Sequence, residues 1–190
     1  NTLRGNLNWM KSHEIKMVSG AFGDDVEDVK PVVPKGLSDS GALDAVFEIL
    51  CKAGRTAPMT KALLIPEAWS KRASIIPDEH AALYAYCNSV MEPWDGPAAI
   101  CATDGRWVIA GMDRNGLRPM RYTLMQDGLL VVGSETGMVH VDESRVVEKG
   151  RVGPGQMIAV DLDGCRFHHD RELRDMLSVE HPYTEWVTNI

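Results

Sequence analysis

The stretch AAICATDGRWVIAGM (98–112) carries the strongest local indication of the fold. Two runs of strand-forming residues, 98–103 and 107–112, flank the pair Asp104-Gly105. An Asp-Gly pair between two such runs favours a tight hairpin, because these residues tolerate the positive φ angles that the turn requires. The sequence therefore predicts an antiparallel hairpin near the middle of the chain.

Short runs after this hairpin predict further strands, separated by glycine-containing turns. We expect them at 121–124, 129–133, 140–142, 156–161 and 165–168. The glycine-rich segment 150–155 lacks the spacing of a P-loop and the Lys-Ser/Thr that follows one. We interpret it as a strand connection and not as a phosphate-binding loop.

Helical spacing dominates the chain before the hairpin. Leu43, Val46, Phe47 and Leu50 fall at i, i+3, i+4 and i+7, which predicts a helix that begins near residue 38. Other helices are expected at 1–10, at 60–65, from 77 to about 91 and at 170–179, with a surface loop at 20–35 and an exit segment from 182. Helices followed by an antiparallel meander indicate an α+β fold.

Composition narrows the class of protein. The 190 residues are 44% hydrophobic and 25% charged, which is typical of a globular chain. The net charge of −7 and the lack of a basic stripe argue against a nucleic-acid partner. No apolar run approaches the ~18 residues needed to cross a bilayer, so no membrane association is expected.

The cysteines are widely spaced and form no CxxC pair. We predict four free thiols, most of them buried, and no zinc site. Adjacent His168 and His169 do not favour a shared metal ion either, since neighbouring residues of a strand point to opposite faces. No nucleophile–base pair is recognisable, and position 1 is asparagine and not the Cys, Ser or Thr of an N-terminal nucleophile.

Asp39 is the candidate site residue. It lies between two serines at the start of the helix predicted from residue 38. A carboxylate there either caps the helix or, held by the helix end, binds the ammonium group of an amino acid. The spacing alone leaves both interpretations open.

Arg114 and Arg118 flank the predicted Asn115-Gly116 turn. Two arginines beside a tight turn can clamp a carboxylate or phosphate, or can fasten the loop to neighbouring acids. Their role is left open here.

Five strings in this order resemble the class II glutamine amidotransferases, and most closely the domain that opens the large subunit of glutamate synthases. They are NTLRGNLNWM (1–10), GLSDSGALD (36–44), MEPWDGPAAI (91–100), MDRNGLRPMRY (112–122) and EKGRVGPGQMIAVDL (148–162). The resemblance implies part of a four-layer αββα fold of the N-terminal-nucleophile type. It also implies that Asp39 binds the α-amino group of L-glutamine.

The resemblance places the family's remaining chemistry outside this sequence. The nucleophilic cysteine, the arginine that grips the amino acid and the Asn-Gly oxyanion hole would all precede Asn1. The FMN-binding synthase domain, iron–sulfur clusters and the NAD(P)H or ferredoxin electron donor would belong to other parts of the same polypeptide. We therefore expect no catalytic, cofactor or metal-binding residue in the chain, and no glutaminase activity from it alone.

The expected organisation is the later portion of an amidotransferase domain at 1–165 and a connecting segment at 166–190. The expected compartment is the cytoplasm, or the plastid stroma in a photosynthetic eukaryote. Uncovered sheet edges would favour self-association. Two alternatives stay open: a stand-alone, non-catalytic binding or scaffold module, and part of another class II amidotransferase.

Overall fold

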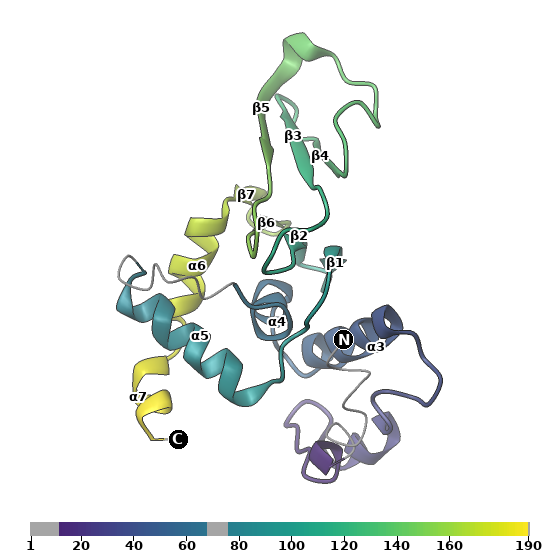
Figure 1. The fold of residues 1–190 in the computed structure, drawn as a ribbon, viewed down its shortest axis with the longest axis vertical. Coiled ribbons are helices and arrows are strands. Elements are labelled where there is room, and N and C mark those ends of the chain that lie inside the picture. Colours follow the sequence, from purple (N-terminus) through teal and green to yellow (C-terminus); the bar gives the residue numbers. More distant parts are fainter. Residues whose placement is uncertain (1–11, 68–75, 190) are drawn as a thin grey trace.

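A computed structural model of the chain describes residues 12–67 and 76–189 (Figure 1). The helices are η1 (Gly23–Val29), α3 (Asp39–Lys52), α4 (Ala57–Leu64), α5 (Asp78–Val90), η3 (Glu143–Arg145), α6 (Asp170–Val179) and α7 (Tyr183–Thr188). The strands are β1 (Ala99–Thr103), β2 (Trp107–Met112), β3 (Arg121–Met125), β4 (Leu130–Gly133), β5 (Val146–Arg151), β6 (Met157–Asp161) and β7 (Arg166–His168). The helix predicted at 1–10 lies outside the described residues.

The predicted Asp-Gly hairpin joins β1 to β2. The carboxylate of Asp104 accepts hydrogen bonds from the backbone N–H groups of Arg106 (2.9 Å) and Trp107 (2.7 Å), and Gly105 takes a φ of 98°. The second oxygen of Asp104 accepts from the N–H of Ala57 (2.7 Å) at the start of α4. One turn residue thus also fixes a helix to the sheet.

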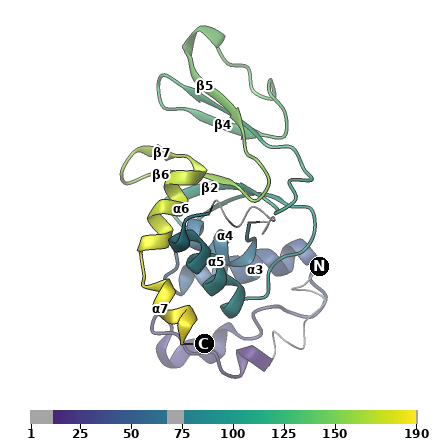
Figure 2. The ribbon, with the colours of Figure 1, turned by 60° about the vertical axis from the view of Figure 1, so that its left-hand side comes forward.

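All strand pairs are antiparallel and form two sheets, β1-β2-β6-β7 and β4-β3-β5. Helices cover one side of the four-stranded sheet, and the three-stranded sheet extends away on the other side (Figures 1 and 2). The α+β fold with antiparallel sheets and flanking helices is confirmed. The predicted simple meander is wrong, because β3, β4 and β5 leave the first sheet between β2 and β6.

Two hydrophobic clusters explain this arrangement. Trp107 and Ile109 of β2 join the large cluster beneath the helices, whereas Ala110 and Met112 join a smaller cluster with Met120 of the β2–β3 connection. Both faces of β2 are therefore buried at its C-terminal end. An almost unbroken apolar strand is the expected sequence for such a position.

The predicted helices α3, α5 and α6 are confirmed. Gly54 follows α3 with a φ of 100°, as expected for a helix terminus. The helix predicted at 60–65 instead begins at Ala57, because the hydroxyl of Thr56 accepts a hydrogen bond from the N–H of Met59 (3.4 Å) and Pro58 occupies the first turn.

Two other predictions are wrong. The loop expected at 20–35 contains η1, and the strand expected at 140–142 is an exposed loop segment. The strand connection predicted at 150–155 is confirmed, because this segment joins the end of β5 to β6. The strand β5 itself, which pairs with β3, was not predicted. Apolar and polar residues alternate too weakly in VVEKGR to indicate a strand. Hydrogen bonds to the distant strand β3 stabilise the extended conformation of this segment instead.

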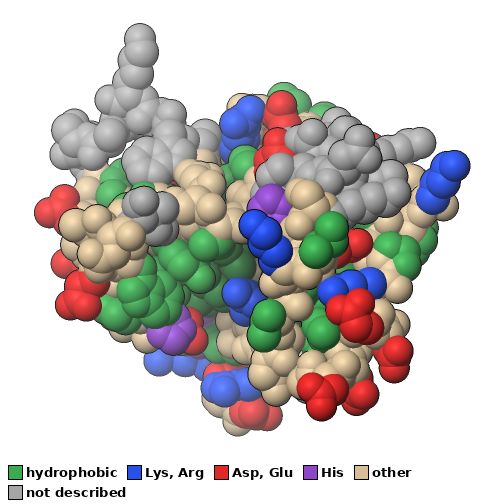
Figure 3. Space-filling view, turned by 90° about the horizontal axis from the view of Figure 1, so that it is seen from below, with side chains coloured by type: hydrophobic (Ala, Val, Ile, Leu, Met, Phe, Trp, Pro, Cys, Tyr) green, Lys and Arg blue, Asp and Glu red, His purple; other side chains and the backbone are tan. Residues whose placement is uncertain are grey.

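The segment from Pro182 is also more than an exit. It forms α7, whose Tyr183 and Trp186 rings lie 5.0 and 5.3 Å from the ring of Tyr86 in α5. Figure 3, which views the molecule from below, shows hydrophobic side chains around a hollow at this end of the molecule. The domain division at residue 165 stays a prediction, although β7 and α6 contact β6.

All four cysteines are free, as predicted. Only Cys87 is fully buried, so the expectation that most are buried is wrong. No helix among the described residues is long and apolar enough to cross a bilayer.

Candidate functional site

Asp39 is the first residue of α3, and Ser38 caps the helix in its place. The Ser38 hydroxyl accepts a hydrogen bond from the N–H of Gly41 at 3.0 Å. The Asp39 carboxylate is exposed and accepts only from the adjacent Ser40 N–H, at 2.8 Å, among the hydrogen bonds of the described residues. Asp39 is therefore not the capping residue of α3. One of its carboxylate oxygens stays available to a ligand.

The direction of Asp39 follows from helical spacing. Leu43 and Val46 lie four and seven residues later, and both are buried against the core. Asp39 thus stands at the N-terminal end of the inward-facing stripe of α3.

A groove of about 390 Å³ runs beside this helix. Its walls are one side of α3, including Leu43 and Phe47, and the strand β1, including Ile100. β1 is an edge strand of its sheet among the described residues. Asp39 does not line the groove itself, but it lies one helical turn before Leu43, which does.

Three of the four thiols are not activated for nucleophilic attack. Burial raises the pKa values of Cys51, Cys87 and Cys101, that of Cys87 to about 12. A raised pKa reduces the thiolate population, and the thiolate is the nucleophile. Cys165 is exposed and donates to the carbonyl of Leu162 at 3.5 Å.

Three of the histidines lie on α5, on β7 and at the start of α6. His80 is buried and pairs with Asp175 at 2.7 Å, which links α5 to α6. His168 is buried beside the ring of Trp107, whereas His169 is exposed at the start of α6. Within residues 12–67 and 76–189, no group of three or more His, Cys, Asp or Glu side chains is arranged to hold a metal ion.

The turn after β2 is organised by Asp113, which sequence reasoning did not single out. Its side chain is 1% exposed and accepts hydrogen bonds from four backbone N–H groups. The donors are Ala98 (3.0 Å), Asn115 (2.8 Å), Gly116 (2.9 Å) and Leu117 (3.3 Å). The sequence contains a signal for this role, because Asp113 lies two residues before Asn115-Gly116. An Asp side chain often accepts a hydrogen bond from the backbone N–H two residues later.

The two arginines of this turn have different surroundings. Arg114 donates to Asp95 at 2.8 Å, so it fastens the loop to a neighbouring acid. Arg118 forms no ion pair with any residue that the structure describes and lines a surface cavity instead.

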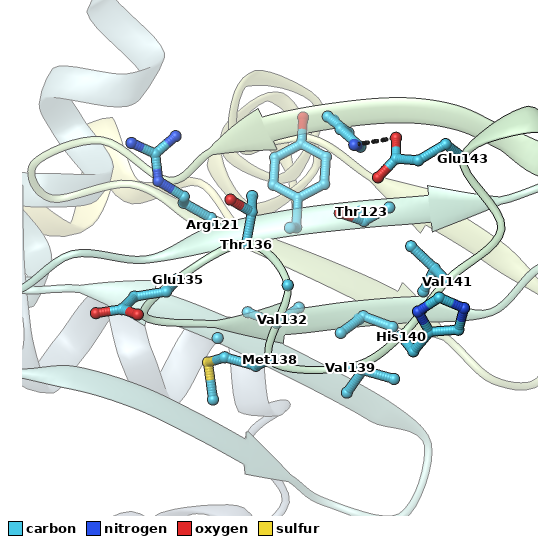
Figure 4. Close-up of a pocket in the computed structure, with 15 residues that line it drawn as sticks. Arg121, Thr123, Val132, Glu135, Thr136, Met138, Val139, His140, Val141 and Glu143 are labelled. Atoms are coloured by element: carbon cyan, nitrogen blue, oxygen red, sulfur yellow. Dashed lines mark hydrogen bonds and ion pairs between the residues drawn. The ribbon is translucent and has the colours of Figure 1, made fainter.

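A second cavity, of about 390 Å³, lies between β3, β4 and the segment 135–143. Figure 4 shows Arg121 at one end of it, Glu143 at the other and Thr123 between them. Glu143 forms an ion pair with Lys149, so the two charges at that end of the cavity compensate each other.

A buried ionic cluster lies beneath the sheet and was also missed. Lys61 is 1% exposed, and its Nζ donates to the carbonyl oxygen of Gly155 at 2.7 Å. Arg174 pairs with Glu67 and, at 2.5 Å, with Asp170. Burial lowers the pKa of Lys61 to about 8 and raises that of Asp170. The cavity beside the cluster is only about 10 Å³, so the cluster has a structural role.

Comparison with known proteins gives a consistent result. The family model of class-II glutamine amidotransferases matches residues 1–186. The chain is 60% identical over 189 residues to the glutamate synthase (NADPH) large chain of Azospirillum brasilense, and 42% identical over 187 residues to that of Bacillus subtilis. It is 40% identical over 190 residues to the ferredoxin-dependent glutamate synthase of Pyropia yezoensis. These alignments cover 98–100% of the chain but only 12% of each relative.

Proposed function

Because this chain belongs to the class II glutamine amidotransferases, we propose that it is part of the glutaminase domain of a glutamate synthase. In this proposal the complete domain hydrolyses L-glutamine to glutamate and ammonia, and the ammonia is passed to 2-oxoglutarate. The identity of 60% to a glutamate synthase large chain across the whole sequence is the observation that carries the proposal. The same observation favours it over a stand-alone scaffold module or another amidotransferase.

Asp39 is the residue of this chain that holds the substrate. Its carboxylate is exposed, Ser38 already caps the helix, and the ligand group is the α-ammonium of glutamine. A charge-assisted hydrogen bond between an ammonium and a carboxylate is stronger than a neutral one. The contribution of Asp39 is therefore binding and orientation, and the bond-breaking step requires other groups.

We infer that the chain alone releases no ammonia. The three thiols with raised pKa values are poor nucleophiles, and the buried His80 is paired with Asp175. Losing a nucleophile removes nearly all of the rate enhancement of such enzymes.

The described residues do not fit an iron–sulfur cluster, since the cysteines lie on separate elements and form no metal-binding group with other described residues. FMN and iron–sulfur clusters, with NADPH, NADH or ferredoxin as the electron donor, are assigned in this proposal to other parts of a longer polypeptide. A cytoplasmic or plastid-stromal location follows from the same assignment.

Calorimetric titration tests the role of Asp39. L-Glutamine is titrated into the chain and into its Asp39→Asn variant, and glutaric monoamide, which lacks the α-amino group, is titrated into both. We expect Asp39→Asn to weaken glutamine binding by about ten-fold or more, because one charge-assisted contact is lost. Binding of the monoamide should be unchanged.

The matched control is Asp25→Asn, an exposed aspartate on η1 that does not line the groove beside α3. This control variant should bind L-glutamine and glutaric monoamide with the same affinities as the parent chain. Equal weakening by the two variants, or an Asp39→Asn effect of the same size on the monoamide, contradicts the assignment.

A further inference from the structure

A cavity of about 310 Å³ lies between the turn after β2 and the segment that follows β5. Arg118, Arg121 and Arg151 line it, and none of its described lining residues is acidic. Met120 and Val152, which are 6% and 4% exposed, also line it, although strand alternation turns them to the face of the sheet opposite their neighbours Arg121 and Arg151. The arrangement of three arginines is that of a binding site for an anion.

Strand pairing brings two of these arginines together. Arg121 of β3 and Arg151 of β5 are directly opposite in the antiparallel register. Directly opposite residues project from the same face of a sheet, and like charges in such a pair destabilise it. A bound anion would remove this repulsion.

The third arginine is held nearby by the backbone. The N–H of Val152 donates to the carbonyl of Met120 at 3.0 Å, and the turn at Gly116 lies directly against Pro154. Both contacts fix the segment that carries Arg118 beside the segment that carries Arg151. The site is therefore built by two chain segments that the fold holds in register.

These arginines lack acidic partners, a property that among the described arginines they share only with Arg55, and Arg121 forms no ion pair with Glu135 or Glu143 of the cavity in Figure 4. Six described arginines form ion pairs with carboxylates: Arg106, Arg114, Arg145, Arg166, Arg171 and Arg174. Arg118, Arg121 and Arg151 form none with any residue in the described ranges. The chain has 27 acidic and 20 basic residues, so the clustering is not a consequence of a basic composition.

We propose that Arg118, Arg121 and Arg151 form a binding site for a small organic anion that carries two or more carboxylate or phosphate groups. The guanidinium group is planar and binds both kinds of oxyanion bidentately. The site lies on the three-stranded sheet and is independent of the proposed role of Asp39 on α3.

Titration of the chain with tricarballylate and with pyrophosphate tests the proposal. Calorimetry and thermal melting are recorded in buffer whose ionic strength is kept constant with sodium chloride, so that general screening is the same throughout. We expect millimolar or tighter binding of at least one probe, and the tighter probe identifies a carboxylate or a phosphate ligand. No binding of either probe at millimolar concentration overturns the proposal.

The double variant Arg121→Gln/Arg151→Gln should weaken binding by about ten-fold or more for each lost guanidinium contact. Arg145→Gln, which removes an arginine already paired with Asp127, is the matched control and should bind as the parent chain does. Asp39→Asn should also bind the probes normally, which separates failure of this site from failure of the proposed glutamine site. Equal binding by the double variant and the parent chain overturns the assignment.

A second measurement does not depend on a probe. If Arg121 and Arg151 repel each other in the absence of an anion, Arg151→Gln should melt at a temperature equal to or above that of the parent chain in anion-free buffer. A lower melting temperature for Arg151→Gln would show that Arg151 is already satisfied by contacts within the chain, which contradicts the proposal.

Discussion

The buried ammonium of Lys61 in α4 donates a 2.7 Å hydrogen bond to the carbonyl oxygen of Gly155, 94 residues further along the chain. The N–H of Gly155 in turn donates to the carbonyl of Asp113 at 2.8 Å. This contact connects the helical layer to the turn that carries Arg114 and Arg118.

Replacing Lys61 by Met should destabilise the chain by about 1–3 kcal/mol, because the change leaves the buried carbonyl oxygen of Gly155 without its hydrogen-bond donor. Urea denaturation measures the free energy of unfolding. Lys52→Met, an exposed position on α3, is the control and should change stability by less than about 0.5 kcal/mol. A loss of unfolding free energy no larger than that of the control would mean that buried Lys61 contributes little to stability.

Gly116→Ala should destabilise by about 2–4 kcal/mol, since a methyl group there meets Pro154 in addition to the strain of a positive φ. The added Cβ would lie 2.7 Å from Cγ of Pro154, and φ is 63°. Gly128→Ala separates the two effects, because Gly128 has a φ of 85° but nothing within 4 Å of the added Cβ. Thermal melting of both variants should show a smaller loss for Gly128→Ala.

Asp113→Ala should cost more than about 3 kcal/mol, because it leaves several N–H groups of the turn without an acceptor. The stability of Asp113→Asn should lie between those of the parent chain and Asp113→Ala, since one acceptor oxygen remains. The backbone amides of Ala98, Asn115 and Gly116 should exchange hydrogen faster in Asp113→Ala, because they lose their acceptor. Asp142→Ala, which removes only an exposed cap on Ser144, should cost about 1 kcal/mol.

Acid unfolding should depend on Asp161. Hydrogen bonds from the guanidinium of Arg106, and then from backbone N–H groups, lower the pKa of Asp161 from 3.8 to about 2. Since the folded-state pKa is below the unfolded one, this stabilisation is complete above pH 3.8 and is lost as the pH falls towards 2.

Asp161→Asn should therefore be less stable than the parent chain at neutral pH, and the difference should shrink as the pH approaches 2. Asp163→Asn, which removes the more distant partner of Arg106 at 3.5 Å, should follow the parent curve closely. Urea titrations at several pH values give the comparison. A difference that does not vary with pH would show that Asp161 acts through packing and not through its charge.

β1 is an edge strand among the described residues, and its edge should promote self-association of the isolated chain, because unpaired strand edges pair with one another. Cys101→Lys introduces a charge on the exposed side of this strand and should lower the associated fraction in sedimentation velocity. Val108→Lys, at an exposed position on the central strand β2, should have less effect. A monomeric parent chain would contradict this expectation.

Local sequence patterns were sufficient for several elements. The Asp104-Gly105 pair determined the β1–β2 hairpin because the turn depends on two adjacent residues. The spacing of Leu43, Val46 and Phe47 determined α3, since one apolar stripe is enough to specify a buried helix face. Asp39 was found by its resemblance to a family segment, and its role stays a proposal.

Other features depend on partners that are distant in the chain. β5 forms because β3 supplies its hydrogen bonds, and Gly150 allows the ring of Tyr122 to lie against the strand. α7 forms against the Tyr86 ring of α5. No local pattern around Val146 or Tyr183 contains this information.

The sequence by itself determined the family, the α+β class and the start of α3 at which Asp39 stands, because each is encoded in contiguous residues. Only the tertiary structure decided that Ser38 and not Asp39 caps α3, that Lys61 is buried against Gly155, and that Arg121 and Arg151 lie opposite each other. Burial, strand register and the choice between neighbouring polar side chains are set by contacts across the fold, and such contacts have no fixed spacing in the sequence.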